Sequence, residues 1–354
     1  MRNNEKMKEV TAMECKKIVF TEINKAELLT ETVREMGEND VLVDTFVTTI
    51  SSGTERANIT GDPFVTIASA VPTVNFPRTA GYSAAGVVMA VGENVKSVKV
   101  GDRVALSWSK HTNLQVLNEN NVHLIENDKV SYAAAALTHI ATFPMAAIRK
   151  CRLEMGESAM VMGLGILGLL AVQLLRAAGA VPVIAVDPNP DRRQKALQLG
   201  ADYAFDPFAA DFVEMVKNAS HGGVNVAIEV TGNGPALNQA LDCMAKLGRV
   251  ALLGCTRQSD FTVDYYHKVH GPGISLIGAH TNARPNAESS AGYWTDHDDA
   301  MAVLRLCGAG RINLDAMIEE THAPEEAPQI FQRLIHEKSF PVVQFDWTRM
   351  KREG

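Results

Sequence analysis

The chain has 354 residues, of which 46% are hydrophobic and 21% are charged, and this length is typical of about two globular domains. A formal net charge of −7, with no long basic cluster, argues against a nucleic-acid-binding protein. The charged segment 1–17 has no apolar stretch typical of a secretory signal, and the five cysteines form no CxxC pair. We therefore expect a cytoplasmic protein without disulfides or a cysteine-rich zinc lobe.

The first part of the chain predicts mainly β-structure. Strands are expected at 18–20, 41–50, 87–91 and within 100–105. The polar segment 51–56 is expected to be a turn, and 61–79, which holds three prolines, is expected to be a loop. Short strands separated by glycine turns are typical of a small β-barrel. The Ala-rich segment 133–148 then predicts a helix that is broken or kinked at Pro144.

A strand–turn–helix–strand pattern in the middle of the chain indicates dinucleotide binding. An apolar strand at 159–162 leads into Gly163–Leu164–Gly165–Ile166–Leu167–Gly168, and a helical pattern follows from 169 to 178. A second strand at 183–186 ends at Asp187, 19 residues after the last glycine, close to the roughly 20 residues expected. The apolar run 159–172 is too short for a membrane span, so no membrane partner is expected.

Each part of this pattern has a physical role. Gly163 permits a tight turn, Gly165 lets the backbone approach a pyrophosphate, and Gly168 allows close packing of helix on strand. The N-terminus of the helix offers unpaired N–H groups to the phosphates. Asp187 is expected to accept hydrogen bonds from the ribose hydroxyls, which favours NAD over NADP. Arg192, five residues later, is the alternative partner for a 2′-phosphate.

Strands and helices alternate through the rest of the chain. Helices are expected at 191–199, 235–247, 300–307 and 324–335, and strands at 224–230, 249–253, 274–279 and 342–345. Such alternation is typical of a parallel, doubly wound sheet. Further cofactor contacts are expected from Ile166 and Leu167 at the start of the helix, and from Thr231, Gly254 and Cys255 after later strands.

Several motifs occur together in a fixed order: Gly81 to Gly86, Val100–Gly101–Asp102–Arg103–Val104, the glycine stretch, Leu199–Gly200–Ala201–Asp202 and Glu229–Val230–Thr231–Gly232. This combination resembles the medium-chain dehydrogenase/reductase family over about residues 18–348. The resemblance implies an α/β fold, with a GroES-like β-barrel catalytic domain (1–148 plus 285–354) and a Rossmann cofactor domain (149–284). It also implies an active site in the cleft, a small-molecule substrate, and a homodimer or dimer-based tetramer joined through 274–279.

The chain departs from the zinc-dependent members of that family at the ligand positions. Where they have a cysteine, this chain has Ser52, and where they have His-Glu it has Tyr82–Ser83. The third ligand falls near His139 by spacing, and no cysteine stands in 106–112, where the structural zinc lobe belongs. The resemblance therefore implies that both zinc sites are lost, and we expect no metal. A weak site using Glu55 and His139 is the alternative.

Without zinc, other side chains have to move the proton of the substrate's hydroxyl group. The candidates are Thr54, Glu55, Tyr82 and His139. Each also has a structural interpretation: a local cap for the threonine, an ion pair for the glutamate, barrel packing for the tyrosine and helix packing for the histidine. Candidates for the substrate pocket are Ser52, Trp108, Tyr293 and Trp294. Aromatic residues at such positions also serve packing alone.

Three functions are consistent with these residues. The first is an NAD-dependent oxidoreductase acting on a secondary alcohol, a polyol or a sugar-like substrate, or on its ketone. The second is a zinc-independent enoyl or quinone reductase; such relatives commonly use NADPH, which Asp187 opposes. The third is a dinucleotide-binding protein without turnover. The sequence does not name the substrate, the direction of hydride transfer or the acid/base residue.

Overall fold

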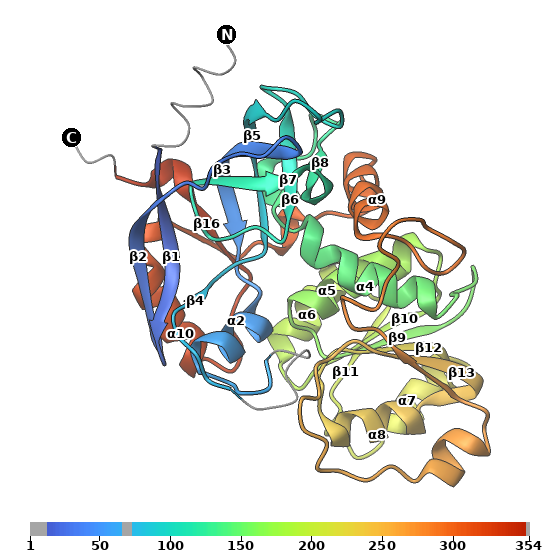
Figure 1. Ribbon diagram of the computed structural model, residues 1–354. Coiled ribbons are helices and arrows are strands. Elements are labelled where there is room, and N and C mark those ends of the chain that lie inside the picture. The colour runs from blue at the N-terminus through green and yellow to red at the C-terminus, as the bar shows by residue number, and fades with distance from the viewer. Residues whose placement is uncertain (1–12, 66–72, 352–354) are drawn as a thin grey trace. The chain divides into compact units, whose positions relative to one another are not determined.

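The computed structural model describes residues 13–65 and 73–351, which form two compact units (Figure 1). The first unit combines the chain up to His139 with Ala300–Ala309 and the chain from Leu314. The second unit combines Ile140–Asp299 with Gly310–Asn313. It therefore takes in 140–148, 285–299 and 310–313, which the sequence assigned to the other domain. Ion pairs explain part of this difference, because Arg149 bonds Asp299 at 2.8 Å within the second unit.

The first unit is rich in β-structure, as predicted, and most of its strand pairs are antiparallel. Its strands are β1 (Glu14–Glu22), β2 (Lys25–Thr32), β3 (Asp40–Thr49), β4 (Arg78–Thr79), β5 (Ser83–Val91), β6 (Arg103–Ser107), β7 (Leu114–Asn118), β8 (Val122–Leu124), β15 (Glu320–His322) and β16 (Val343–Asp346). They form a three-stranded sheet, β2-β1-β4, and a seven-stranded sheet, β15-β16-β3-β5-β6-β8 with β7 paired to β3. The helices are α2 (Ser52–Ile59), α3 (Tyr132–Ala135) and α10 (Ala327–His336), and α10 packs over Ile18 and Phe20 of β1.

Helix α2 corrects the prediction of a polar turn at 51–56. The helix begins there because the Glu55 carboxylate accepts the backbone N–H of Ser51 at 2.8 Å. Ala57 and Ile59 are then buried on its inner side. Tertiary contacts of this kind outweigh the weak helix propensity of the Ser-Gly-Thr start.

The Ala-rich segment is also broken elsewhere than predicted. Helix α4 (Thr138–Lys150) runs on through Pro144, and the interruption lies before it, between α3 and Thr138. Within the predicted loop at 61–79, residues 66–72 lie outside the described residues, and the last two residues form β4.

The second unit contains a six-stranded parallel sheet, which confirms the predicted doubly wound domain. Its strands are β9 (Ala159–Met162), β10 (Val183–Val186), β11 (Tyr203–Phe205), β12 (Val224–Glu229), β13 (Met244–Leu252) and β14 (Ser275–Gly278). Their order is β11-β10-β9-β12-β13-β14, and every neighbouring pair is parallel. The helices are α5 (Ile166–Ala177), α6 (Pro190–Gln198), α7 (Phe212–Ala219) and α8 (Gly234–Asp242), and α9 (Asp296–Gly308) follows β14 in the chain. Short helical turns elsewhere are Glu119–Asn121, Tyr266–His270, Asp315–Met317, Pro324–Glu326 and Trp347–Arg349.

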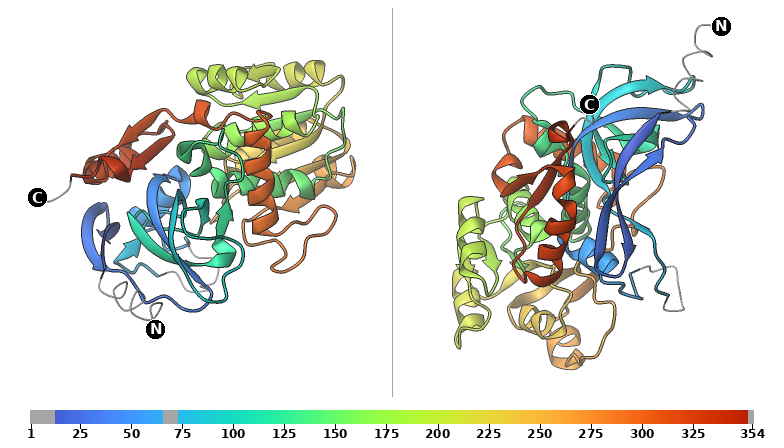
Figure 2. Two further views of the ribbon diagram at one scale, coloured as in Figure 1. Left: turned by 90° about the horizontal axis from the view of Figure 1, so that it is seen from above. Right: turned by 90° about the vertical axis from the view of Figure 1, so that its left-hand side faces the viewer.

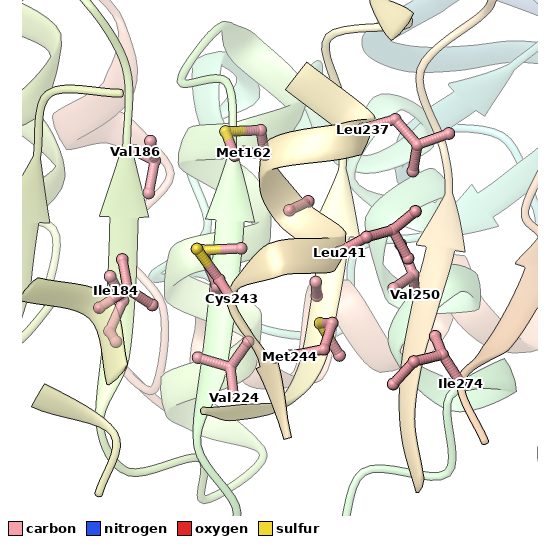
Figure 3. Close-up of a cluster of buried hydrophobic side chains, with 14 of the residues drawn as sticks. Met162, Ile184, Val186, Val224, Leu237, Leu241, Cys243, Met244, Val250 and Ile274 are labelled. Carbon is pink, nitrogen blue, oxygen red and sulfur yellow. The ribbon is translucent and has the colours of Figure 1, made fainter. Parts of the chain in front are cut away.

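Helices cover both faces of this sheet (Figures 1 and 2). On one face, Leu237 and Leu241 of α8 pack over strand residues that include Met162, Ile184 and Val250 (Figure 3). Because side chains alternate along a strand, Val161 points to the opposite face, where α5 contacts β9 and β10. Within the described residues, no helix has both the length and the apolar character that crossing a membrane requires.

One predicted boundary in this unit is wrong. The helix expected at 235–247 ends at Asp242, and Met244 already pairs with Val224 as part of β13. The pairing of neighbouring strands sets this boundary, and helical periodicity alone does not reveal it. Across the two units, the sequence also missed helix α7 and strands β2, β7, β8, β11 and β15.

Candidate functional site

The predicted cofactor residues of the second unit follow four strands of the parallel sheet. Gly163 follows β9, Asp187 follows β10, Thr231 follows β12, and Gly254 and Cys255 follow β13. The chain runs from β9 outward to β11 on one side and from β12 outward to β14 on the other. The strand order therefore reverses between β9 and β12, and the carboxyl ends at such a reversal are where doubly wound sheets bind their ligands.

The three glycines of the loop after β9 differ in what surrounds them. Gly163 has a φ of +97°, and a Cβ atom on it would lie 2.8 Å from the Thr231 side chain. A Cβ on Gly168 would lie 1.9 Å from the carbonyl oxygen of Gly163. At Gly165, directly before the N-terminus of α5, a Cβ would meet no protein atom within 4 Å. Gly163 and Gly168 are thus required by the protein's own packing, whereas the space over Gly165 remains for a ligand.

Asp187 holds the glycine loop in place. Its side chain is buried, and its two carboxylate oxygens accept the backbone N–H groups of Leu164 and Asn189, both at 2.8 Å. The Arg192 guanidinium lies 3.8 Å from one of these oxygens. Arg193 instead donates to the carbonyl oxygen of Asp187 itself. Asp187, the residue predicted to bind ribose, therefore lies beside the glycine loop and holds it through a hydrogen bond to Leu164.

Sequence reasoning assigned no role to Glu229, the last residue of β12. Its side chain is 2% exposed and accepts hydrogen bonds from the backbone N–H of Thr231 at 2.7 Å and of Gly232 at 3.2 Å. Burial raises the pKa of Glu229, and the bonds from Thr231 and Gly232 oppose that rise. An acid followed by Thr-Gly at the end of a buried strand was the available signal.

The loops after β12 and β13 contact each other through glycines. Gly232 has a φ of +63°, and a Cβ on it would lie 2.9 Å from the Cys255 backbone. A Cβ on Gly254 would lie 2.2 Å from the nitrogen of Gly232. The structure thus brings Thr231, Gly254 and Cys255 together at the same edge of the sheet as Gly163.

In the first unit, three predicted residues form an aromatic cluster. The buried His139 ring lies 4.7 Å from the Trp108 ring and 5.6 Å from the Tyr82 ring, measured between centroids, with both pairs edge to face. Trp108 is 41% exposed. The Tyr82 hydroxyl donates a hydrogen bond to the Ser51 hydroxyl. A polar hydroxyl pair therefore lies beside a buried imidazole.

Glu55 does not extend toward that cluster as a free base. One carboxylate oxygen accepts the Ser51 N–H, and the other lies 2.9 Å from Nε2 of His111. Both side chains are buried, at 2% and 0% exposed. The neighbouring Arg56, a possible ion-pair partner by sequence, instead donates to the carbonyl oxygens of Leu334 and Glu337. Sequence reasoning missed His111.

The remaining predicted residues are more dispersed. Ser52 and Thr54 lie half-buried in the first turn of α2. In the second unit, the Trp294 ring is covered by the Arg149 guanidinium, 3.5 Å from its centroid, and Tyr293 is 44% exposed. Their grouping with Ser52 and Trp108 into one pocket stays a prediction.

Comparison with known proteins agrees with this fold. The model of an alcohol dehydrogenase GroES-like domain matches residues 37–168, and the model of a zinc-binding dehydrogenase domain matches residues 167–291. The chain is 31% identical over 250 residues to an L-threonine 3-dehydrogenase of Symbiobacterium thermophilum, covering 62% of this chain and 69% of the relative. It is 31% identical over 229 residues to the (R,R)-butanediol dehydrogenase of Bacillus subtilis, covering 57% of this chain and 66% of the relative.

A solved structure gives the same result for the fold. The crystal structure of 2R,3R-butanediol dehydrogenase from Bacillus subtilis superposes with a TM-score of 0.78 at 24% identity, covering 94% of this chain and 99% of that one. The GroES-like and doubly wound domains expected from the sequence are thereby confirmed. The chain belongs to the medium-chain, zinc-type alcohol dehydrogenase family of NAD(P)-dependent oxidoreductases.

Proposed function

We propose that this protein is an NAD-linked dehydrogenase of secondary alcohols, polyols or related sugar-like substrates that works without a catalytic metal. The observation that carries the proposal is the hydrogen bond from Tyr82 to Ser51 beside His139. By the family resemblance, Tyr82 and Ser52, the residue after Ser51, stand where zinc-dependent relatives carry ligands. The bound cofactor supplies or accepts the hydride. The chain's own residues then have to bind the cofactor and move one proton.

Asp187 supports NAD over NADP. A carboxylate beside the glycine loop accepts hydrogen bonds from ribose hydroxyls, whereas a 2′-phosphate there would meet a like charge. Arg192, 3.8 Å away, is the group that would favour NADP instead. Gly165 and the N-terminus of α5 would receive the pyrophosphate, because that space is free of protein atoms.

The donor set does not fit a zinc ion. The family positions offer the hydroxyls of Ser52, Tyr82 and Ser83, and the Ser83 hydroxyl donates to the carbonyl oxygen of Ala136 at 2.7 Å. Neutral hydroxyls are poor zinc ligands, which normally are thiolate, imidazole or carboxylate. The alternative pairing of Glu55 with His139 is opposed by the bonds of Glu55 to Ser51 and His111. The described residues contain no group of three or more His, Cys, Asp or Glu side chains suited to a metal.

Tyr82 is the proposed proton carrier. Oxidation of an alcohol moves a hydride from carbon to the cofactor and releases the hydroxyl proton, leaving a carbonyl group. In the reverse direction, the Tyr82 hydroxyl donates its proton to the carbonyl oxygen as the hydride arrives at carbon. A proton from solvent, relayed through the Ser51 hydroxyl that is already bonded to Tyr82, then restores the phenol and leaves the serine unchanged. His139 packs against the Tyr82 ring and is the second candidate for this role.

The relatives support the substrate class. An (R,R)-butanediol carries its hydroxyls on chiral, secondary carbons, and L-threonine is oxidised at carbon 3, which is also secondary. For this chain we therefore propose a small secondary alcohol or polyol.

A cofactor-linked absorbance assay tests the function. NADH should be oxidised by small hydroxyketones and NAD reduced by the matching diols or polyols. Turnover restricted to enones or quinones would favour the reductase alternative. Tight NADH binding without turnover on any carbonyl, enone or quinone would favour the non-catalytic alternative.

A further inference from the structure

A buried acid–imidazole pair lies directly behind the Tyr82–Ser51 hydrogen bond. Glu55 and His111 are 2% and 0% exposed, and the Glu55 carboxylate lies 2.9 Å from Nε2 of His111. The other oxygen of Glu55 holds the backbone N–H of Ser51 at 2.8 Å. Two buried polar groups held in this way fix each other strongly, because breaking the hydrogen bond leaves them unsatisfied away from water. The pair therefore fixes the backbone that carries the Ser51 hydroxyl.

The same histidine also fixes the chain next to Tyr82. The backbone N–H of His111 donates to the carbonyl oxygen of Ala80 at 3.0 Å. Gly81 lies against the imidazole, since a Cβ atom there would be 2.9 Å from the ring, and its φ is +84°. Gly81 directly precedes Tyr82. His111 thus contacts the segments on both sides of the hydroxyl pair.

The orientation of the imidazole is set from its far side. Nδ1 of His111 lies 2.7 Å from the Thr48 hydroxyl, which accepts the indole N–H of Trp347 at 3.1 Å. Because an indole N–H only donates, the Thr48 proton is available to Nδ1, and Nε2 then carries the proton that Glu55 accepts. The Phe345 ring packs edge to face against the imidazole, with centroids 5.5 Å apart. Few other orientations of the ring satisfy these contacts.

We propose that the His111–Glu55 pair is a positioning unit for proton transfer by Tyr82. The pair holds two chain segments, 51–55 and 80–82, so that the Ser51 hydroxyl stays within hydrogen-bond distance of the Tyr82 hydroxyl. Neither residue is proposed to touch substrate or cofactor. This inference rests on the proposed function, in which Tyr82 carries the proton.

A double-mutant cycle in the full-length protein tests the coupling. Glu55→Ala should lower kcat for carbonyl reduction by about 10- to 100-fold, the scale expected when a reacting group is displaced by a fraction of an ångström to one ångström. NADH affinity should not change. Glu55→Gln should restore only part of kcat, because its amide oxygen still accepts the Ser51 N–H while its amide nitrogen replaces the oxygen that faces Nε2 of His111. In a Tyr82→Phe background, Glu55→Ala should lower kcat no further.

Two further variants keep the test decisive. His123→Phe is the matched control, because His123 is also fully buried and lies 2.8 Å from a hydroxyl, that of Ser107, but is not part of the proposed positioning pair. Its kcat should match that of the unchanged protein. If Glu55→Ala does not fold, Thr48→Val replaces it, since it keeps the side-chain volume and removes the one hydroxyl that bonds both Nδ1 of His111 and the Trp347 indole. Thr48→Val should lower kcat when Tyr82 is present and should have no further effect in the Tyr82→Phe background.

The outcomes separate the two proposals. The positioning role is overturned if Glu55→Ala lowers kcat by the same factor with Tyr82 present and in the Tyr82→Phe background. It is also overturned if Glu55→Ala leaves kcat unchanged. Neither result contradicts the proposed dehydrogenase function, provided that Tyr82→Phe itself has a strongly reduced kcat. A Tyr82→Phe variant that turns over at the full rate would overturn the proton role of Tyr82 and the positioning role with it.

Discussion

A Cβ atom on Gly168 would lie 1.9 Å from the carbonyl oxygen of Gly163, so the first turn of α5 contacts the end of β9 without room for a side chain. Three residues earlier, Gly165 has open space where its side chain would be. One glycine of the loop is therefore required for folding, and the other is available for ligand binding. Alanine substitution separates these two requirements.

Gly165→Ala should fold normally and lose cofactor affinity. Its backbone is extended, so alanine is tolerated and even gains about 0.4–1 kcal/mol from the unfolded state. The added methyl group occupies the space proposed for the pyrophosphate. Gly168→Ala, the matched control, should instead lower stability by about 1–3 kcal/mol through overpacking. Thermal unfolding and NADH fluorescence titration measure both effects, and unchanged NADH affinity in Gly165→Ala would contradict the placement.

NADH should bind more tightly than NADPH, and Asp187→Asn should reduce this preference. Hydrogen bonds to a charged group contribute about 1.5–3 kcal/mol, so NADH affinity should fall roughly 10- to 100-fold while NADPH affinity stays level or rises. Asp191→Asn is the control, because it removes an exposed negative charge near Asp187 without touching the glycine loop. Equal or tighter NADPH binding by the unchanged protein would disprove the preference.

Cys255 should be the thiol that reports on cofactor binding. It is exposed after β13, whereas burial raises the pKa of Cys151 and of Cys243 to about 12. At about pH 8 those two thiols stay protonated and unreactive. Iodoacetamide followed by peptide mass spectrometry should show Cys255 labelled before either of them, and saturating NADH should slow the labelling. If the labelling rate of Cys255 is the same with and without NADH, the cofactor does not bind next to Cys255.

The protein should form a dimer or a dimer-based tetramer through β14. This strand is one of the two outer strands of the parallel sheet, and Leu276 on it is 38% exposed. An apolar outer strand with open backbone groups favours pairing with another chain. Light scattering should give at least twice the mass of one chain, and Leu276→Lys should shift the population toward monomer. A single-chain mass for the unchanged protein at micromolar concentration would count against this interface.

The sequence predicted the parts of the fold that are specified locally. The glycine loop, α5 and Asp187 fall within one continuous stretch, so spacing and periodicity were enough to predict their arrangement. The contacts that correct the predictions join distant residues. Glu55 meets His111 across 56 positions, and this contact helps turn the predicted loop into α2. No local pattern reveals such a pair.

The residues of the candidate site also fall into those that the sequence predicted and those that only the structure reveals. The sequence singled out Tyr82 and His139 from their positions in a familiar motif order, and the structure brings their rings within 5.6 Å. Ser51 was passed over in favour of its neighbour, because the strand before it and the helix after it decide which hydroxyl faces Tyr82. Strand pairing and helix start are three-dimensional properties that residue types alone do not determine.

Metal content and turnover, measured on the same purified sample, test the central claim most directly. The account predicts zinc far below one ion per chain and NADH-linked carbonyl reduction that survives a strong chelator. Under those conditions Tyr82→Phe should be slower by on the order of 10²-fold, the scale of a lost general acid. One zinc per chain, with turnover that is abolished by the chelator and restored by added zinc, would contradict the account.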